Sequence, residues 1–88
     1  MELKFRGQFN RDIDINNREL LEHIRNAILN VKSAKSISQI QNFKKLRKYK
    51  VHYRIAISKD YRIGVMIHGQ KIWFVCFGNR NNFYKYFP

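Results

Sequence analysis

The sequence is poor in acidic residues, cysteine and proline, and these shortages exclude several classes of protein. Only 6 of the 88 residues are Asp or Glu, against 18 Lys and Arg, so the formal net charge is +12. The one cysteine, Cys76, permits neither a disulfide framework nor a cysteine zinc site. No apolar run approaches the roughly 20 residues of a membrane-spanning helix. We therefore expect no membrane association, no metal and no cofactor.

What the sequence does contain is enough apolar material for one small core. Hydrophobic residues make up 44% of the chain and aromatic residues 15%, which is typical of a folded protein despite the charge. A chain of 88 residues is too short for two separate cores, so we expect a single domain over residues 1–88. Residues 1–6 lack the apolar stretch of a signal peptide, which predicts a cytoplasmic protein.

The positive charge is concentrated after the first 22 residues. Residues 1–22 hold four Lys or Arg and five Asp or Glu, whereas residues 23–88 hold 14 Lys or Arg and a single acid, Asp60. Repulsion between these positive charges disfavours the folded state, so binding of an anionic partner is the natural reason for the protein to carry them. A polyanion such as RNA or DNA is favoured over a merely solvated basic surface, because phosphate contacts release counterions.

The first half of the chain is predicted to form a strand and then helix. Alternating apolar and basic residues indicate a strand that ends near Gly7. Helical spacing of apolar residues predicts a long amphipathic helix over about Asn17–Ser33, capped by Asn16 with Glu19. A short helical turn is expected around residues 37–40.

From Phe43 the apolar residues alternate instead, which predicts strands. A short strand is expected at Phe43–Arg47, followed by strands over residues 51–58, 61–68 and 71–78. The predicted class is therefore α+β. It comprises an N-terminal strand, one long and one short helix, and a twisted antiparallel sheet of three to four strands with a short C-terminal segment.

The register of these strands decides which side chains share a face. A three-residue turn at residues 58–60 places the large apolar side chains of two strands on one face, so Arg54 and Arg62 project together from the other. A two-residue turn at residues 69–70 is predicted to send Ile72, Phe74 and Cys76 to the core face. The arginine face would then also carry Trp73, Val75 and Phe77.

No familiar catalytic motif is present, but cations and a phenol converge. Arg54 and Arg62 share a face, Arg80 follows the last strand, and Tyr84 lies in a C-terminal segment that is expected to fold over that face.

Arginines contact phosphate in pairs of hydrogen bonds and stabilise charge on phosphorus. A tyrosine stacks on a base or donates a proton. RNA carries its own nucleophile, the 2′-hydroxyl, so orientation and charge stabilisation suffice for cleavage. The alternative to cleavage is that the arginines only bind the nucleic-acid backbone.

Motifs spread in order along the whole chain resemble the RelE/ParE toxin superfamily. They are Phe9 to Asp12, Lys44 to Leu46, Tyr53 to Ile55, Asp60 to Gly64, Val75 to Arg80 and Phe83 to Pro88. The resemblance implies the RelE-like microbial RNase fold and a toxin of a bacterial type II toxin–antitoxin pair. The RelE branch cuts mRNA in the ribosomal A site. The implied partners are therefore mRNA, the ribosome and an acidic antitoxin, with a monomer when free and a toxin–antitoxin hetero-oligomer in the cell.

The resemblance also implies which residues form the site. Phosphate and transition-state contacts would fall to Arg62 and Arg80, orientation of the nucleophile to Arg54, and stacking or proton donation to Tyr84. RNA and ribosome contacts would be made by Lys44, Lys45, Arg47, Lys48, Lys50 and Tyr86.

Two positions depart from the family pattern. Ala56 stands where a basic residue is common, which predicts attenuated activity, and Asn79 stands where histidine is frequent. Because arginine does not lose its proton, Arg54 is a poor general base, and His52 or a lysine is the candidate acceptor.

Three functions follow from these observations. The main one is a ribosome-dependent, metal-independent endoribonuclease that inhibits translation. The alternatives are a ParE-like inhibitor of DNA gyrase and a non-catalytic module that binds RNA or the ribosome. The set of Arg54, Arg62, Arg80 and Tyr84 favours the nuclease, because a gyrase inhibitor has no need of cations around a phosphate-sized site.

Overall fold

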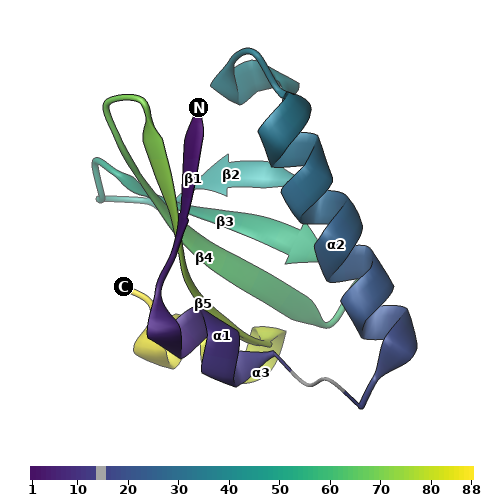
Figure 1. Ribbon diagram of the computed structural model, residues 1–88. Helices are drawn as coiled ribbons and strands as arrows, with labels where there is room; N and C mark the ends of the chain where they lie inside the picture. The colour runs from purple at the N-terminus through teal and green to yellow at the C-terminus, as the bar shows by residue number, and fades with distance from the viewer. Residues whose placement is uncertain (14–15) are drawn as a thin grey trace.

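The computed structural model describes residues 1–13 and 16–88, which form a sheet flanked by helices (Figure 1). In chain order the elements are β1 (Glu2–Phe5), α1 (Gly7–Asp12), α2 (Arg18–Ser33), the 3-10 turn η1 (Ile37–Gln39), β2 (Phe43–Lys45), β3 (His52–Ile57), β4 (Tyr61–His68), β5 (Lys71–Asn79) and α3 (Arg80–Tyr86). The strand order in the sheet is β1-β5-β4-β3-β2.

The predicted α+β class is confirmed, with a larger and mixed sheet. Five strands pair in one sheet, rather than the three to four expected. β1 runs parallel to β5, whereas the other neighbours are antiparallel. The N-terminal strand was predicted, but its pairing with the last strand is a long-range contact that local sequence patterns do not contain.

α2 covers one face of the sheet along its length (Figure 1). Its buried residues are Leu20, Ile24 and Val31, which belong to the predicted apolar stripe. The cap lies one residue later than predicted: Asn17, not Asn16, precedes the helix, and its Oδ1 accepts a hydrogen bond from the Leu20 backbone N–H at 3.0 Å. The buried sheet residues on the core face are Ile55, Ile57, Ile63, Val65, Ile72, Phe74 and Phe77.

The short helix α1 was not predicted. Its only buried residue is Phe9, which is 1% exposed and packs on Phe74 with ring centroids 5.5 Å apart. One large apolar residue in six gives no helical period, so this helix has no signature in the sequence.

The β3–β4 hairpin has the predicted register, but β5 departs from it. Ile55 pairs with Ile63, and Ile57 with Tyr61 across the three-residue turn. Along β4 and β5 the register shifts, so that Val65 pairs with Phe74 but Gly64 pairs with Cys76.

Val75 is therefore an extra residue on β5, as in a β-bulge, and the later side chains change face. Phe77 lies in the core and is 7% exposed, whereas Cys76 lies on the face that carries Arg54. The predicted placement of Cys76 in the core and Phe77 on the arginine face was wrong, because strict alternation assumes a strand without a bulge.

α3 is held on this second face by aromatic packing. Phe83 and Phe87 are buried, with ring centroids 5.3 Å apart. Gly64 permits the approach, because a Cβ there would lie 2.9 Å from both the Phe87 ring and the Cys76 Sγ. The C-terminal segment therefore folds over the arginine face, as predicted. In the described residues, no helix is long and apolar enough to cross a membrane.

Candidate nucleic-acid site

Cations and one phenol line a cavity of about 500 Å³ on the face of the sheet opposite α2. We call it the cation cavity. Its lining residues are Lys44, Lys45, Leu46, Arg47, Arg54 and Tyr84. β2 and the loop after it supply one wall, β3 supplies Arg54, and α3 supplies Tyr84. No carboxylate belongs to the lining, within the part of the chain that the structure describes.

Two of the cations face each other directly across neighbouring strands. Lys44 on β2 pairs with Arg54 on β3, and such like-charged cross-strand pairs destabilise a sheet. The Arg54 guanidinium is fixed by donating from Nη1 to the Asn42 carbonyl at 3.1 Å. The remaining donors are left for a ligand, so the arrangement favours an anion in this cavity.

Tyr84 reaches the cation cavity because α3 is anchored at both ends. At its start, the Arg80 backbone N–H donates to the Asp60 carbonyl at 2.7 Å, and the Asn79 side chain caps the helix by accepting from the Asn81 N–H at 2.8 Å. At its end, Phe87 is buried against the sheet. Tyr84 itself is 53% exposed, and its ring stands edge-on to Phe83 with centroids 5.0 Å apart. Its phenol is therefore both positioned and accessible to a ligand.

Arg62 and Arg80 lie outside the lining of this cavity. Arg62 is on the arginine face, but its Nη1 donates to the carbonyls of Tyr61 at 2.7 Å and Lys59 at 3.3 Å, within its own turn. Arg80 begins α3, and its backbone N–H donates to the Asp60 carbonyl at 2.7 Å. The structure thus brings Arg54 and Tyr84 together, whereas the other two arginines gather at the β3–β4 turn. Their assignment as phosphate contacts stays a prediction.

The residues assigned to RNA and ribosome contact are divided in the same way. Lys44, Lys45 and Arg47 line the cation cavity. Lys48 and Lys50 are exposed in the loop between β2 and β3. Tyr86 is 81% exposed and lies on the other flank of α3, away from this cavity.

His52 shares the face of Arg54 but does not line the cavity. Its ring contacts Tyr49 and Phe87 edge-on, with centroids 5.4 and 5.5 Å away. Burial lowers the pKa of His52 below its usual 6.5, and the nearby His68 adds to this effect. The imidazole is therefore neutral at pH 7, and its buried Nδ1 has no hydrogen-bond partner among the described residues.

Sequence reasoning missed a second cavity, of about 630 Å³, between α1, β5 and α3. Its residues come from segments far apart in the chain, among them Gln8, Asp12 and Asn82. Asp12 was noticed only as part of a family motif, and no spacing in the sequence links it to α3.

Solved structures of toxins resemble this chain over nearly its whole length. A chain of the RelB–RelE antitoxin–toxin complex from Methanococcus jannaschii matches with a TM-score of 0.79 and 27% identity, covering 97% of this chain and 99% of that chain. YafQ from E. coli matches with a TM-score of 0.66 and 11% identity, over 94% and 97% of the two chains. A copper-bound mutant toxin from Helicobacter pylori gives 0.65 and 15%, over 92% and 96%.

The second and third of these matches show a common fold, and the first adds sequence identity to it. No protein-family model and no curated protein matches the sequence. The sequence motifs extend along the whole fold, from Phe9 in α1 to Tyr84 in α3. With the topology and the RelE match at 27% identity, these motifs support a RelE-like toxin of the RelE/ParE superfamily.

Proposed function

We propose that this protein is the toxin of a type II toxin–antitoxin pair and that it cleaves mRNA on the ribosome. The observation that carries the proposal is the cation cavity, where Arg54 and Tyr84 lie with three further cations and no acid among the described lining residues. An RNA backbone matches that charge, and the structural similarity to RelE and YafQ supports a toxin. Neutralisation by an acidic antitoxin segment follows from the same charge.

The chemistry needs only groups that RNA and the protein supply. The 2′-oxygen attacks the adjacent phosphorus as the bond from phosphorus to the 5′-oxygen breaks. The products are a 2′,3′-cyclic phosphate and a 5′-hydroxyl. Arg54 orients the reacting groups and stabilises charge on the phosphorane, and Tyr84 stacks on a base or gives a proton to the leaving 5′-oxygen. The 2′-hydroxyl proton passes to a group other than Arg54, because guanidinium does not deprotonate.

Lysines of the cavity and His52 are the candidate proton acceptors. His52 is neutral at pH 7, and its ring packs edge-on against Phe87 outside the lining of the cation cavity. Arg62 and Arg80 are proposed to contact phosphates next to the scissile one, from the end of the sheet where β4 begins. The exposed Lys48 and Lys50 extend the positive surface toward ribosomal RNA.

The proposal is tested by mapping mRNA 5′ ends on translating ribosomes after expression of the chain. Cuts in phase with codons support the proposal. Intact mRNA with double-strand DNA breaks would instead indicate a gyrase inhibitor. Intact mRNA with salt-sensitive RNA binding would indicate a binding module.

A matched pair of variants separates the site from the overall charge. Arg54→Ala is expected to lower cleavage about 10²- to 10³-fold, the usual effect of losing one transition-state donor. Arg25→Ala removes the same charge from the exposed side of α2, on the other face of the sheet, and should cleave as the wild type does. Equal losses in both variants would contradict the assignment.

A further inference from the structure

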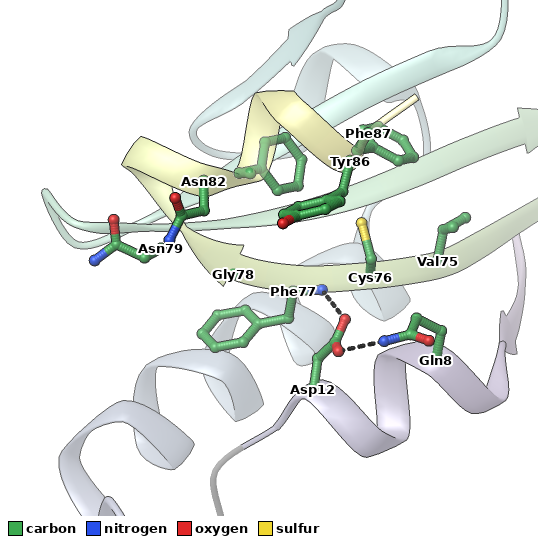
Figure 2. Close-up of a pocket in the computed structure, with 11 residues that line it drawn as sticks. Gln8, Asp12, Val75, Cys76, Phe77, Gly78, Asn79, Asn82, Tyr86 and Phe87 are labelled. Carbon is green, nitrogen blue, oxygen red and sulfur yellow. Dashed lines mark hydrogen bonds between the residues drawn. The ribbon is translucent and has the colours of Figure 1, made fainter.

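The second cavity straddles the edge of β5 where that strand has no neighbour. β1 pairs with β5 only as far as Phe74, so residues 75–79 present an open edge in the described sheet. Figure 2 shows α1 with Asp12 and Gln8 on one side of this edge and α3 with Asn82 and Tyr86 on the other. We call this space the edge cavity.

The lining of the edge cavity has the opposite character to that of the cation cavity. It contains the Asp12 carboxylate and the side-chain amides of Gln8, Asn79 and Asn82, but no lysine or arginine in the described part of the chain. A cavity lining without a cation among its described residues is unusual in a protein of net charge +12. The Arg11 guanidinium donates from Nη2 to Gln8 Oε1 at 3.2 Å but does not belong to the lining, so the lining itself favours a neutral group that donates and accepts hydrogen bonds over a bare phosphate.

The Asp12 carboxylate is held in place but is not saturated. Its Oδ2 accepts the Phe77 backbone N–H at 3.0 Å, and its Oδ1 accepts from Gln8 Nε2 (Figure 2). Each carboxylate oxygen accepts about two hydrogen bonds, so one position on each remains for a ligand. A ligand with two parallel N–H donors could use one position on each oxygen.

Aromatic and amide groups complete the edge cavity. The Tyr86 ring is 81% exposed and lies above the edge of β5 (Figure 2), where its open face is available for stacking. The Asn82 side chain is exposed, and the Asn79 amide uses its oxygen to cap α3 and keeps its NH₂ donors. An aromatic face with amides and a carboxylate around it is the chemistry that proteins use to read an unstacked RNA base.

We infer that the edge cavity binds a guanine base of the RNA strand that the cation cavity cleaves. Guanine is the one common RNA base whose Watson–Crick edge offers two adjacent N–H donors, N1–H and N2–H, to a carboxylate. The amides of Asn79 and Asn82 then serve its O6 and N7 acceptors. The inference rests on the proposed function, because it assigns base preference to that same RNA.

The two cavities border the same helix, α3, which one RNA strand would have to cross to enter both. Phe83 lines the edge cavity and the next residue, Tyr84, lines the cation cavity, with ring centroids 5.0 Å apart. An RNA strand that crosses α3 at this point places a phosphate against Arg54 and a neighbouring base against Asp12.

Binding of nucleosides, which carry no phosphate, tests the inference apart from cleavage. The ¹⁵N-labelled full chain is titrated with guanosine, inosine and uridine while amide NMR signals are followed. Guanosine should shift the signals of Phe77, Gly78 and Asn82. Inosine, which lacks only the 2-amino group, should bind about tenfold more weakly, since one hydrogen bond to a charged group is lost. Uridine should bind more weakly still.

Two variants and a control locate the effect. Asp12→Asn keeps an acceptor for Phe77 but offers one carboxylate oxygen fewer, and it should abolish the difference between guanosine and inosine. Tyr86→Leu, at an exposed position, should weaken all nucleosides alike. Glu22→Gln removes an exposed acid of α2 and should change nothing.

Equal shifts by guanosine, inosine and uridine, or shifts confined to Arg54 and Tyr84, would overturn the inference. Failure of the proposed function has a separate signature. In that case mRNA stays intact in the cleavage assay while guanosine still binds the edge cavity.

Discussion

The two flanks of α3 differ in chemistry although one helix borders both. On one flank, the cation cavity joins Arg54 and Tyr84 to three further cations. On the other, the edge cavity holds a carboxylate and three amides without a cation among its described residues. The difference indicates how a strongly basic protein could distinguish between RNA bases although it attracts every phosphate. Phosphate attraction is independent of sequence, so any reading of bases requires a region kept free of that attraction.

Both cavities depend on how α3 sits on the sheet. The bulge at Val75 turns Cys76 toward α3, and Gly64 opposite it leaves space for the Phe87 ring. Phe77 is sent to the core by the same bulge, which leaves its N–H at the open edge for Asp12. The bulge in β5 therefore shapes the edge cavity at Phe77. It also helps to seat Phe87, which holds α3 between the two cavities.

The largest effect is expected from Phe87→Ala, which removes that anchor. Phe87 is 4% exposed, and loss of a buried Phe side chain lowers the free energy of unfolding by about 3–5 kcal/mol. Both mRNA cleavage and guanosine binding should fall together, because α3 borders both cavities. Urea unfolding followed by circular dichroism measures the stability. Tyr86→Ala, at a highly exposed position of the same segment, should leave stability within about 0.5 kcal/mol.

The thiol of Cys76 reports on the edge cavity alone. Burial raises the pKa of Cys76 to about 11 from its usual 9.0, and the Asp12 carboxylate adds to the rise. At pH 8 the thiolate fraction is then about a hundredfold lower than in the unfolded chain, so alkylation by iodoacetamide should be slower by a similar factor. Mass spectrometry of the native and urea-unfolded protein measures both rates. Comparable rates would mean that α3 does not cover Cys76.

Ala56→Lys tests whether an added cation on the Arg54 face increases activity. Restoring a basic residue on the Arg54 face should raise mRNA cleavage several-fold. Because Ala56 pairs with Arg62 across β3 and β4, the new like-charged pair should also lower stability by about 0.2–1 kcal/mol. Toxicity titrated by induction level, together with a thermal melt, measures the two effects. Unchanged cleavage would show that Ala56 does not attenuate the protein.

The smallest effect is expected from the pH dependence of His52. The pKa of His52 lies below 6.5 in the folded state, so between that pKa and 6.5 the unfolded chain binds more protons. The contribution of His52 to the free energy of unfolding should therefore be fully present above about pH 6.5 and be lost as the pH falls through the folded pKa. His52→Phe should flatten this decline when urea midpoints are compared across pH. An unaltered decline in that variant would assign it to another group.

Local patterns were sufficient to predict much of this molecule. The apolar stripe of α2 and the alternation in β3 and β4 are local signals, and the need for one apolar face fixed the three-residue turn and the common face of Arg54 and Arg62. Convergence of Arg54 with Tyr84 followed from that register and the family motifs. The structure adds that Arg62 turns to the carbonyls of its own hairpin, which face-sharing alone does not specify.

The missed features are those that depend on long-range contacts. The bulge at Val75 has no mark in an apolar run such as residues 71–78, because either face of that strand is compatible with burial. The edge cavity needs the end of β1, the side chain of Asp12 and the position of α3 at once. These segments lie at opposite ends of the sequence, and only the folded chain brings them together.

The account is tested most directly by the chemistry of the RNA ends that the protein creates. After induction of the wild type, Arg54→Ala and Arg25→Ala, the 3′ ends of mRNA fragments on ribosomes are sequenced with a method selective for 2′,3′-cyclic phosphate. The account predicts codon-phased cyclic ends in the wild type and in Arg25→Ala, with a loss of about 10²- to 10³-fold in Arg54→Ala. Cyclic ends that persist undiminished in Arg54→Ala, or that are absent from the wild type, would contradict it.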